Sequence, residues 1–203
     1  MPDGENSVRQ QYLEAIEAAE NYVYFENQIF LSRACLEVIH GVLEKGIPVL
    51  ALVPADPMPE LSAARSHPGI AAGYEALAKC GEYPNFCLAA PAALRPWGYE
   101  EIYVHSKAAI IDDTWATIGS TNLVFSSFQG DTEMNVSFWD NLTTRTFRTQ
   151  LFDEHGGFSS DHYDGREAIE KLIKIADENR SKREENQPLQ GFIYAIDPEN
   201  WAK

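Results

Sequence analysis

The spacing of apolar residues predicts alternating helices and strands at the start of the chain. Apolar residues recur every three or four positions over residues 8–19, and Ser7 can cap the helix that this spacing predicts. Residues 22–25 are β-prone and predict a strand directly afterwards. Residues 33–44 then predict a second amphipathic helix, and residues 47–53 a buried strand. This alternation predicts a parallel sheet with crossover helices.

From residue 54 onward, the patterns of apolar and polar residues are shorter. The proline-containing residues 54–59 and 91–98 are expected to be irregular. A hairpin is predicted over residues 102–118, with Asp112 and Asp113 in its turn. The remaining predicted elements are a helix over residues 70–79, strands over 86–89 and 134–138, a helix over 141–154 capped by Asn141, and a charged helix over 166–183.

These elements predict one α/β domain over residues 7–155, with a mixed, largely parallel β-sheet flanked by helices. Residues 156–203 change character, from a charged helix through a polar stretch to an aromatic end. We expect them to form a charged, partly helical C-terminal extension. The length of 203 residues allows one sizeable core and little more.

The composition narrows the possible partners. The net charge of −15 argues against general nucleic-acid binding, which needs Lys and Arg to displace phosphate counterions. A phosphate site remains possible, because a few local cations suffice for it. No apolar run is long enough to span a bilayer, so we expect a soluble chain, cytoplasmic or in peripheral contact with a membrane.

The cysteines indicate neither a disulfide framework nor a metal site. Cys35, Cys80 and Cys87 are an odd number without a C-x-x-C pair, so buried thiols are expected, although a bond between Cys80 and Cys87 stays open. No His/Cys spacing suggests structural zinc. We therefore predict no cofactor and no metal.

A spaced motif of chemically active residues dominates the second half of the chain. It has the form H-x-K-x4-D-x6-G-S-x-N. A match at every fixed position arises by chance in roughly three sequences per million, so the joint spacing outweighs its short parts. The fixed positions are His105, Lys107, Asp112, Gly119, Ser120 and Asn122.

These residue types suit the cleavage of a phosphodiester without a metal. His105 in its neutral form can attack phosphorus and become a phosphohistidine. Lys107, two residues on, faces the same side of a strand and adds positive charge beside it. Asn122 and Ser120 offer donors to the non-bridging oxygens, and Gly119 lets the backbone approach closely.

Two nearby acids are predicted to have different roles. Asp112 shares the side of Ser106 on an ideal strand and sits in the predicted turn, so we expect structural support or hydrogen bonding rather than chemistry. An attacking imidazole needs its second nitrogen held, usually by a carboxylate. Glu133 begins the β-prone segment beyond the motif and is the preferred partner of His105, with Asp131 as the competitor.

The motif is the HKD signature of the phospholipase D superfamily, which the chain resembles over residues 7–154. Residues 15–30 resemble the opening of the second half of two-HKD phospholipase D enzymes, and residues 45–54 the strand that follows. The resemblance implies two HKD units about a pseudo-twofold axis. One His attacks phosphorus, the other protonates the leaving alcohol, and water or another alcohol releases the phosphohistidine. His105 would be either the nucleophile or the general acid.

Three functions compete, because the chain carries one HKD motif. The preferred one is the C-terminal half of an enzyme that hydrolyses phospholipids or transfers phosphatidyl groups, since a Glu-Asn-Gln opening is typical of that half. The second is a single-HKD homodimer that acts as a phosphodiesterase or nuclease, although the acidic charge weakens the nuclease. The third is a half-domain that binds phosphate or a partner without turnover.

Residues 26–28, Glu-Asn-Gln, lie at the end of a predicted strand. Asn27 and Gln28 are candidate substrate contacts there, and a capped helix entry is the structural alternative. If the chain turns over, we expect His105→Ala to abolish activity and Asp113→Ala to be nearly silent.

Overall fold

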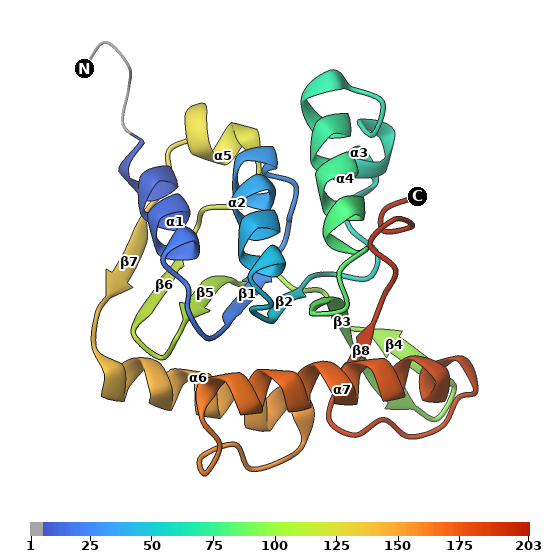
Figure 1. Ribbon diagram of the computed structural model, residues 1–203. Coiled ribbons are helices and arrows are strands. Elements are labelled where there is room, and N and C mark those ends of the chain that lie inside the picture. The colour runs from blue at the N-terminus through green and yellow to red at the C-terminus, as the bar shows by residue number, and fades with distance from the viewer. Residues whose placement is uncertain (1–5) are drawn as a thin grey trace.

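The computed structural model describes residues 6–203 as a β-sheet between two layers of helices (Figure 1). This arrangement confirms the predicted α/β fold class. One layer contains α1 (Ser7–Glu17), α2 (Arg33–Glu44), α3 (Pro59–Ala63), α4 (Pro68–Cys80) and α5 (Phe125–Gln129), and the other α6 (Asn141–Gly156) and α7 (Gly165–Glu184).

The sheet has the strand order β4-β3-β2-β1-β5-β6-β7, and β8 also pairs with β3. Among the paired strands within residues 6–203, only β1–β2 and β2–β3 are parallel. All other pairs are antiparallel, so the sheet is less parallel than expected. The strands are β1 (Val23–Asn27), β2 (Val49–Leu52), β3 (Phe86–Arg95), β4 (Gly98–Glu101), β5 (Lys107–Ile111), β6 (Trp115–Gly119), β7 (Asn135–Phe138) and β8 (Ile193–Ala195).

The parallel part follows from the helix–strand alternation in the sequence. The Ser32 hydroxyl accepts the N–H of Cys35 and so caps α2, the crossover between β1 and β2. Gly46 takes a positive φ of 75° just after α2, which lets the chain turn back into the sheet. β1 then lies in the middle of the sheet, between β2 and β5.

Both faces of β1 are covered, because its alternate side chains enter different cores. Val23 and Phe25 pack in the core beneath α1 and α2. Tyr24 packs on the opposite face, in the core formed with α6 and α7, where its ring meets Phe152 edge-on at 5.0 Å. A strand buried on both faces explains the continuous β-prone run in the sequence.

Several local predictions were wrong. Residues 91–98, expected to be irregular, form the outer half of β3 and its turn into β4. The strand expected from residue 102 begins only at Lys107. The N-cap positions are Asn6 and Asp140, so each helix begins at the residue that was expected to cap it, Ser7 or Asn141, one residue earlier than predicted. The short helices α3 and α5 were not predicted, because they contain too few residues to show a clear helical spacing of apolar positions.

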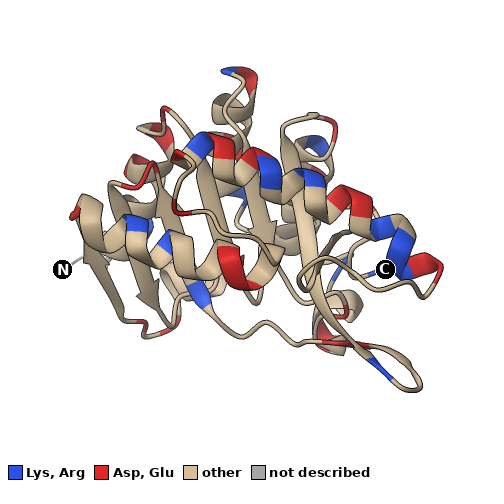
Figure 2. Ribbon diagram, turned by 90° about the horizontal axis from the view of Figure 1, so that it is seen from below, with Lys and Arg blue, Asp and Glu red and all other residues tan. Residues whose placement is uncertain are grey.

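The C-terminal residues add a helix, α7, to one layer and a strand, β8, to the sheet. α7 begins in a capping box between Asp164 and Glu167 and buries residues such as Leu172. Its outer surface carries alternating acidic and basic residues (Figure 2). β8 then pairs with β3, with Ala195 opposite Ala89. Among residues 6–203, no helix combines the length and apolarity needed to cross a membrane.

Candidate active site

His105, Lys107 and the Gly119–Asn122 end of the motif lie at one edge of the sheet, where β1 and β6 end and β5 begins. Asn27, the last residue of β1, is paired with Lys107, the first residue of β5. His105 lies two residues before β5 on an exposed segment, and Ser120 follows β6 directly. The topology therefore brings both ends of the motif beside the end of β1.

Lys107 is buried and held against His105. Its side chain is only 6% exposed. Its Nζ donates to Gln28 Oε1 at 2.8 Å and to the backbone oxygen of His105 at 2.8 Å, and lies 3.4 Å from His105 Nδ1. Burial lowers the pKa of the Lys107 ammonium below its usual value, against an opposing effect of Glu133. The site therefore fixes a positive charge beside the imidazole.

Gln28 holds the chain on both sides of His105. Its Oε1 accepts from Lys107, and its Nε2 donates to the Tyr103 hydroxyl at 2.9 Å. The Tyr103 ring is stacked near the His105 ring, with centroids 6.5 Å apart and an angle of 29°. The imidazole itself stays exposed and accessible to a substrate.

Asn27 holds the other end of the motif. Its side chain is 1% exposed, and Oδ1 accepts the backbone N–H groups of Ile29 and Leu123, both at 3.1 Å. Its Nδ2 donates to the backbone oxygen of Thr121 at 3.3 Å. Asn27 and Gln28, our candidate substrate contacts, thus bind the chain itself.

Asn122 lies in the segment that follows β6 at this edge. Its backbone oxygen accepts the N–H of Val124 at 2.8 Å, which forms a tight turn after the motif. The amide oxygen is buried without a hydrogen-bond partner within residues 6–203. The amide nitrogen donates no hydrogen bond in the same range, so it can serve a phosphoryl oxygen.

Ser120 and Glu133 are bonded to each other. The Ser120 hydroxyl donates to the Glu133 carboxylate and accepts the N–H of Met134 at 3.1 Å. Glu133 precedes β7 by two residues rather than beginning it. Within the described chain, no carboxylate bonds to the His105 ring, so orientation of His105 by Glu133 stays a prediction.

Gly119 permits the close approach of β7 to β6. A Cβ at this position would lie 2.1 Å from Asn135 Oδ1 and 2.4 Å from the backbone oxygen of Met134. Both distances are far inside van der Waals contact. Any side chain at Gly119 would therefore displace β7, the strand that follows Glu133 in the chain.

Asp112 lies at the opposite end of β5 from His105. Its carboxylate accepts the backbone N–H groups of three consecutive residues, at 2.7 to 2.8 Å, and so ties the β5–β6 turn to the start of β1. This contact is structural in kind. The three donors are Glu20, Asn21 and Tyr22.

Asp113 carries a contact that the sequence did not reveal. It accepts two hydrogen bonds from the guanidinium of Arg148, at 2.7 and 3.1 Å, and the Arg148 side chain is 0% exposed. Asp113→Ala would leave that guanidinium buried and unpaired. The substitution is therefore a poor silent control.

Sequence reasoning also missed a buried carboxylate network. Glu26 accepts from the Ser106 hydroxyl at 2.6 Å, from the Tyr24 hydroxyl at 2.8 Å and from His155 Nε2 at 2.9 Å. The contact of Tyr24 with Glu26 could have been predicted, because residues two apart on a strand share a face. His155 could not, because 129 residues separate it from Glu26.

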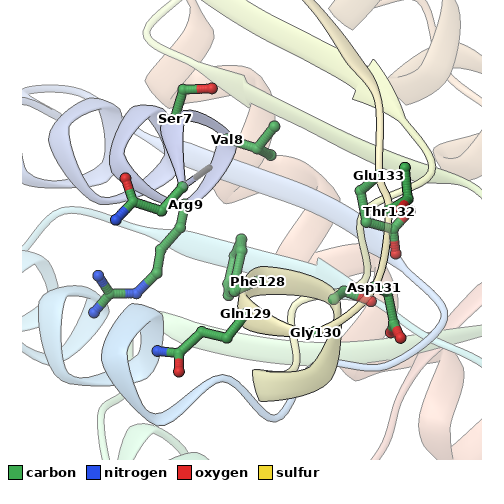
Figure 3. Close-up of a pocket in the computed structure, with 11 residues that line it drawn as sticks. Ser7, Val8, Arg9, Phe128, Gln129, Gly130, Asp131, Thr132 and Glu133 are labelled. Carbon is green, nitrogen blue, oxygen red and sulfur yellow. The ribbon is translucent and has the colours of Figure 1, made fainter. Parts of the chain in front are cut away.

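A separate pocket of about 480 Å³ opens between the start of α1, α5 and the segment before β7 (Figure 3). Asp131, Thr132 and Glu133 form one side, and Val8 and Arg9 lie on the other, with the Arg9 side chain directed away from Asp131 and Glu133. Of the predicted site residues, only Glu133 contributes to the lining. Residues 6–203 hold no group of three or more His, Cys, Asp or Glu side chains placed for one metal ion.

Comparison with known families identifies the class of protein. The family described as "Cardiolipin synthase, PLD-like domain" matches residues 12–155, which is well over half of the chain. The chain therefore belongs to the phospholipase D superfamily, and the resemblance seen in the HKD motif is confirmed.

Two curated relatives are similar to parts of the chain. A protein named phospholipase D B from Dictyostelium discoideum is 29% identical over 66% of this chain and 14% of its own length. A protein named probable cardiolipin synthase YwiE from Bacillus subtilis is 26% identical over 75% of this chain and 28% of its own length. The chain thus spans less than a third of either relative.

Solved structures confirm the fold. NucT from Helicobacter pylori aligns with a TM-score of 0.54 at 20% identity, over 71% of this chain and 84% of that chain. Nuc from Salmonella typhimurium, described as a phospholipase D family member, aligns with a TM-score of 0.53 at 17% identity, over 73% and 86%. At these identities the likeness concerns the fold alone.

Proposed function

We propose that this chain supplies one HKD half-site for phosphodiester hydrolysis or phosphatidyl transfer on phospholipids. His105 acts as nucleophile or general acid, and Lys107 and Asn122 stabilise the phosphoryl oxygens. In the nucleophilic role, the neutral imidazole bonds to phosphorus as the alkoxide leaves with a proton from the second His. Water or an alcohol then attacks phosphorus and returns a proton to the second His, while the bond from phosphorus to His105 breaks and restores the imidazole.

The observation that supports the proposal is that one strand end, Asn27 and Gln28, contacts both ends of the motif. Gln28 holds Lys107 beside His105, and Asn27 holds the turn that presents Asn122. A buried cation next to an exposed imidazole suits a reaction that gathers negative charge on phosphoryl oxygens. Glu133 is proposed to orient His105 when substrate and the second unit are in place.

A phospholipid is favoured over a nucleic acid as the substrate. The two curated relatives are named as a phospholipase D and a cardiolipin synthase. The net charge of −15 disfavours a polyanionic substrate that contacts a wide surface. A single phosphodiester headgroup needs only the local charge of Lys107.

The second HKD unit is proposed to pack beside this edge of the sheet. Ile118 and Val136 are paired across β6 and β7 and are 46% and 67% exposed. Exposed apolar side chains next to an incomplete site suit contact with another protein surface.

A homodimer is the second candidate. The chain covers 84% and 86% of two solved chains of this fold, so the fold occurs in chains of about one such unit. Two copies of this chain could then supply the two His residues of one site.

Solution mass and turnover together test these candidates. The purified chain is sized by sedimentation and assayed on phosphatidylglycerol in detergent micelles, alongside a single-stranded DNA oligonucleotide. The variants are His105→Ala and, as a matched control, His162→Ala, whose side chain is 63% exposed. A tandem fusion of two copies supplies the second unit if the chain is monomeric.

We expect lipid turnover by the dimer or the tandem fusion, lost by at least about 1,000-fold in His105→Ala and unchanged in His162→Ala. Equal activity in His105→Ala would remove His105 from the mechanism. An inactive monomer would exclude the homodimer, and an inactive fusion as well would favour a non-catalytic domain. Phosphate trapped on His105 during turnover would identify it as the nucleophile.

A further inference from the structure

A network centred on the buried Glu26 carboxylate links the end of β1 to the interior of the HKD motif. The Glu26 carboxylate is 7% exposed. One of its oxygens accepts from the Ser106 hydroxyl at 2.6 Å. The other accepts from the Tyr24 hydroxyl at 2.8 Å and from His155 Nε2 at 2.9 Å. A single carboxylate thus joins β1, α6 and the segment that enters β5.

The carboxylate is held in its charged form. Burial raises the pKa of Glu26, but hydrogen bonds from His155, Ser106 and Tyr24 outweigh that effect and bring the pKa below its usual value. A buried carboxylate with hydrogen-bond partners is weak evidence for stability, because apolar residues of similar size often stabilise a fold as well. The network therefore needs an explanation other than core packing.

The position of Ser106 within the HKD motif suggests a role for the network in holding His105. Ser106 stands between His105 and Lys107, and side chains alternate along an extended chain. A bond to Ser106 therefore holds the backbone from the side opposite to the chemistry. Because an ionised Glu26 can only accept, the Ser106 hydroxyl must donate, and its orientation is defined.

His155 anchors the network from a second layer of the fold. It lies in the last turn of α6, where a cationic or donor group is favoured by the helix dipole. Its backbone oxygen accepts the N–H of Phe192 at 2.9 Å, so the segment that leads into β8 holds this helix end. The imidazole is consequently a rigid donor to Glu26.

We propose that Glu26 and His155 are positioning residues for His105, acting through Ser106. Glu26 bonds to Ser106 and Gln28 bonds to Lys107, so two residues at the end of β1 hold the two residues that follow His105. The proposal deepens the proposed function and rests on it for the catalytic consequence. The structural consequence, an ordered His105, stands without turnover.

Three substitutions test the network in the full chain, in the assembly that turns over. Ser106→Ala removes the link and leaves the Glu26–His155 bond in place. His155→Leu removes the donor, and His155→Gln restores an N–H at that position. Ser181→Ala, on the exposed side of α7, is the matched serine control. The readouts are ¹³C relaxation of the His105 ring, kcat and KM on phosphatidylglycerol micelles, and the urea midpoint.

Ser106→Ala and His155→Leu are expected to increase the motion of the His105 ring and to lower kcat by roughly 10- to 100-fold with KM nearly unchanged. His155→Gln should recover most of the loss, and Ser181→Ala should match the wild type. A lower urea midpoint in His155→Leu, with a wild-type His105 ring in Ser106→Ala, would overturn the proposal and assign the pair to stability. If the wild type does not turn over, the proposed function fails while the relaxation data still decide the positioning role.

Discussion

The side-chain oxygen of Asn27 accepts the backbone N–H of Leu123 at 3.1 Å, across 96 residues of sequence. The same oxygen accepts the N–H of Ile29, and the amide nitrogen reaches the backbone of Thr121. One buried amide therefore replaces the ladder hydrogen bonds that would be missing where β1 ends. It also decides where the turn carrying Ser120 and Asn122 lies.

Asn27→Leu is expected to lower the free energy of unfolding by about 2–3 kcal/mol, because buried N–H groups lose their acceptor. Urea unfolding monitored by tryptophan fluorescence measures the change. Gln10→Ala, which removes an exposed amide on α1, serves as the control and should cost less than about 0.5 kcal/mol. Equal costs for the two variants would contradict the role of Asn27.

Asp113→Ala is expected to lower the free energy of unfolding by about 3–5 kcal/mol, because Arg148 keeps its charge in a fully buried position. The double variant Asp113→Leu with Arg148→Met should recover much of that loss. Arg33→Ala, which breaks an exposed pair with Glu37, is the control, with an expected effect under about 0.5 kcal/mol. A silent Asp113→Ala would show that water reaches the guanidinium.

Gly119→Ala is expected to destabilise the protein by about 1–3 kcal/mol, since the new methyl group would overlap Asn135 and Met134. Gly41→Ala is the matched control, because a Cβ there meets nothing within 4 Å and the residue lies inside α2. That control should stabilise the protein by up to about 1 kcal/mol. Opposite signs in thermal unfolding are the expected result.

Glu26 should contribute to stability in a pH-dependent way. Its folded pKa lies below the usual value of 4.5, so its contribution is complete above that value and is lost as the pH falls through the folded pKa. Between pH of about 5 and 3, the unfolding free energy of the wild type should therefore fall more steeply than that of Glu26→Gln. Glu37→Gln, at an exposed site, should keep the wild-type slope. Parallel slopes for wild type and Glu26→Gln would contradict the network.

The sequence predicted the fold class and the signature residues, because periodicity and motif spacing are local properties. His105, Lys107 and Asn122 could be chosen from one contiguous run. The residues that hold them in place could not be predicted, since the hydrogen bonds of Lys107 to Gln28 and of His155 to Glu26 depend on which strands and helices become neighbours. The prediction of an irregular stretch around Pro91 was wrong for a similar reason. The pairing of β3 with β4 and β8 outweighs the low strand propensity of its prolines.

The pairing of β1 with β5 has a consequence for when the HKD residues become ordered during folding. The contacts that arrange the signature join residues 79, 80 and 96 positions apart. Closing loops of that length costs entropy before any contact is gained, and such non-local pairings form slowly. During refolding, the HKD run should therefore become ordered only with the central strands, after the local helices. A peptide containing the motif alone would carry the residues of the site without its geometry.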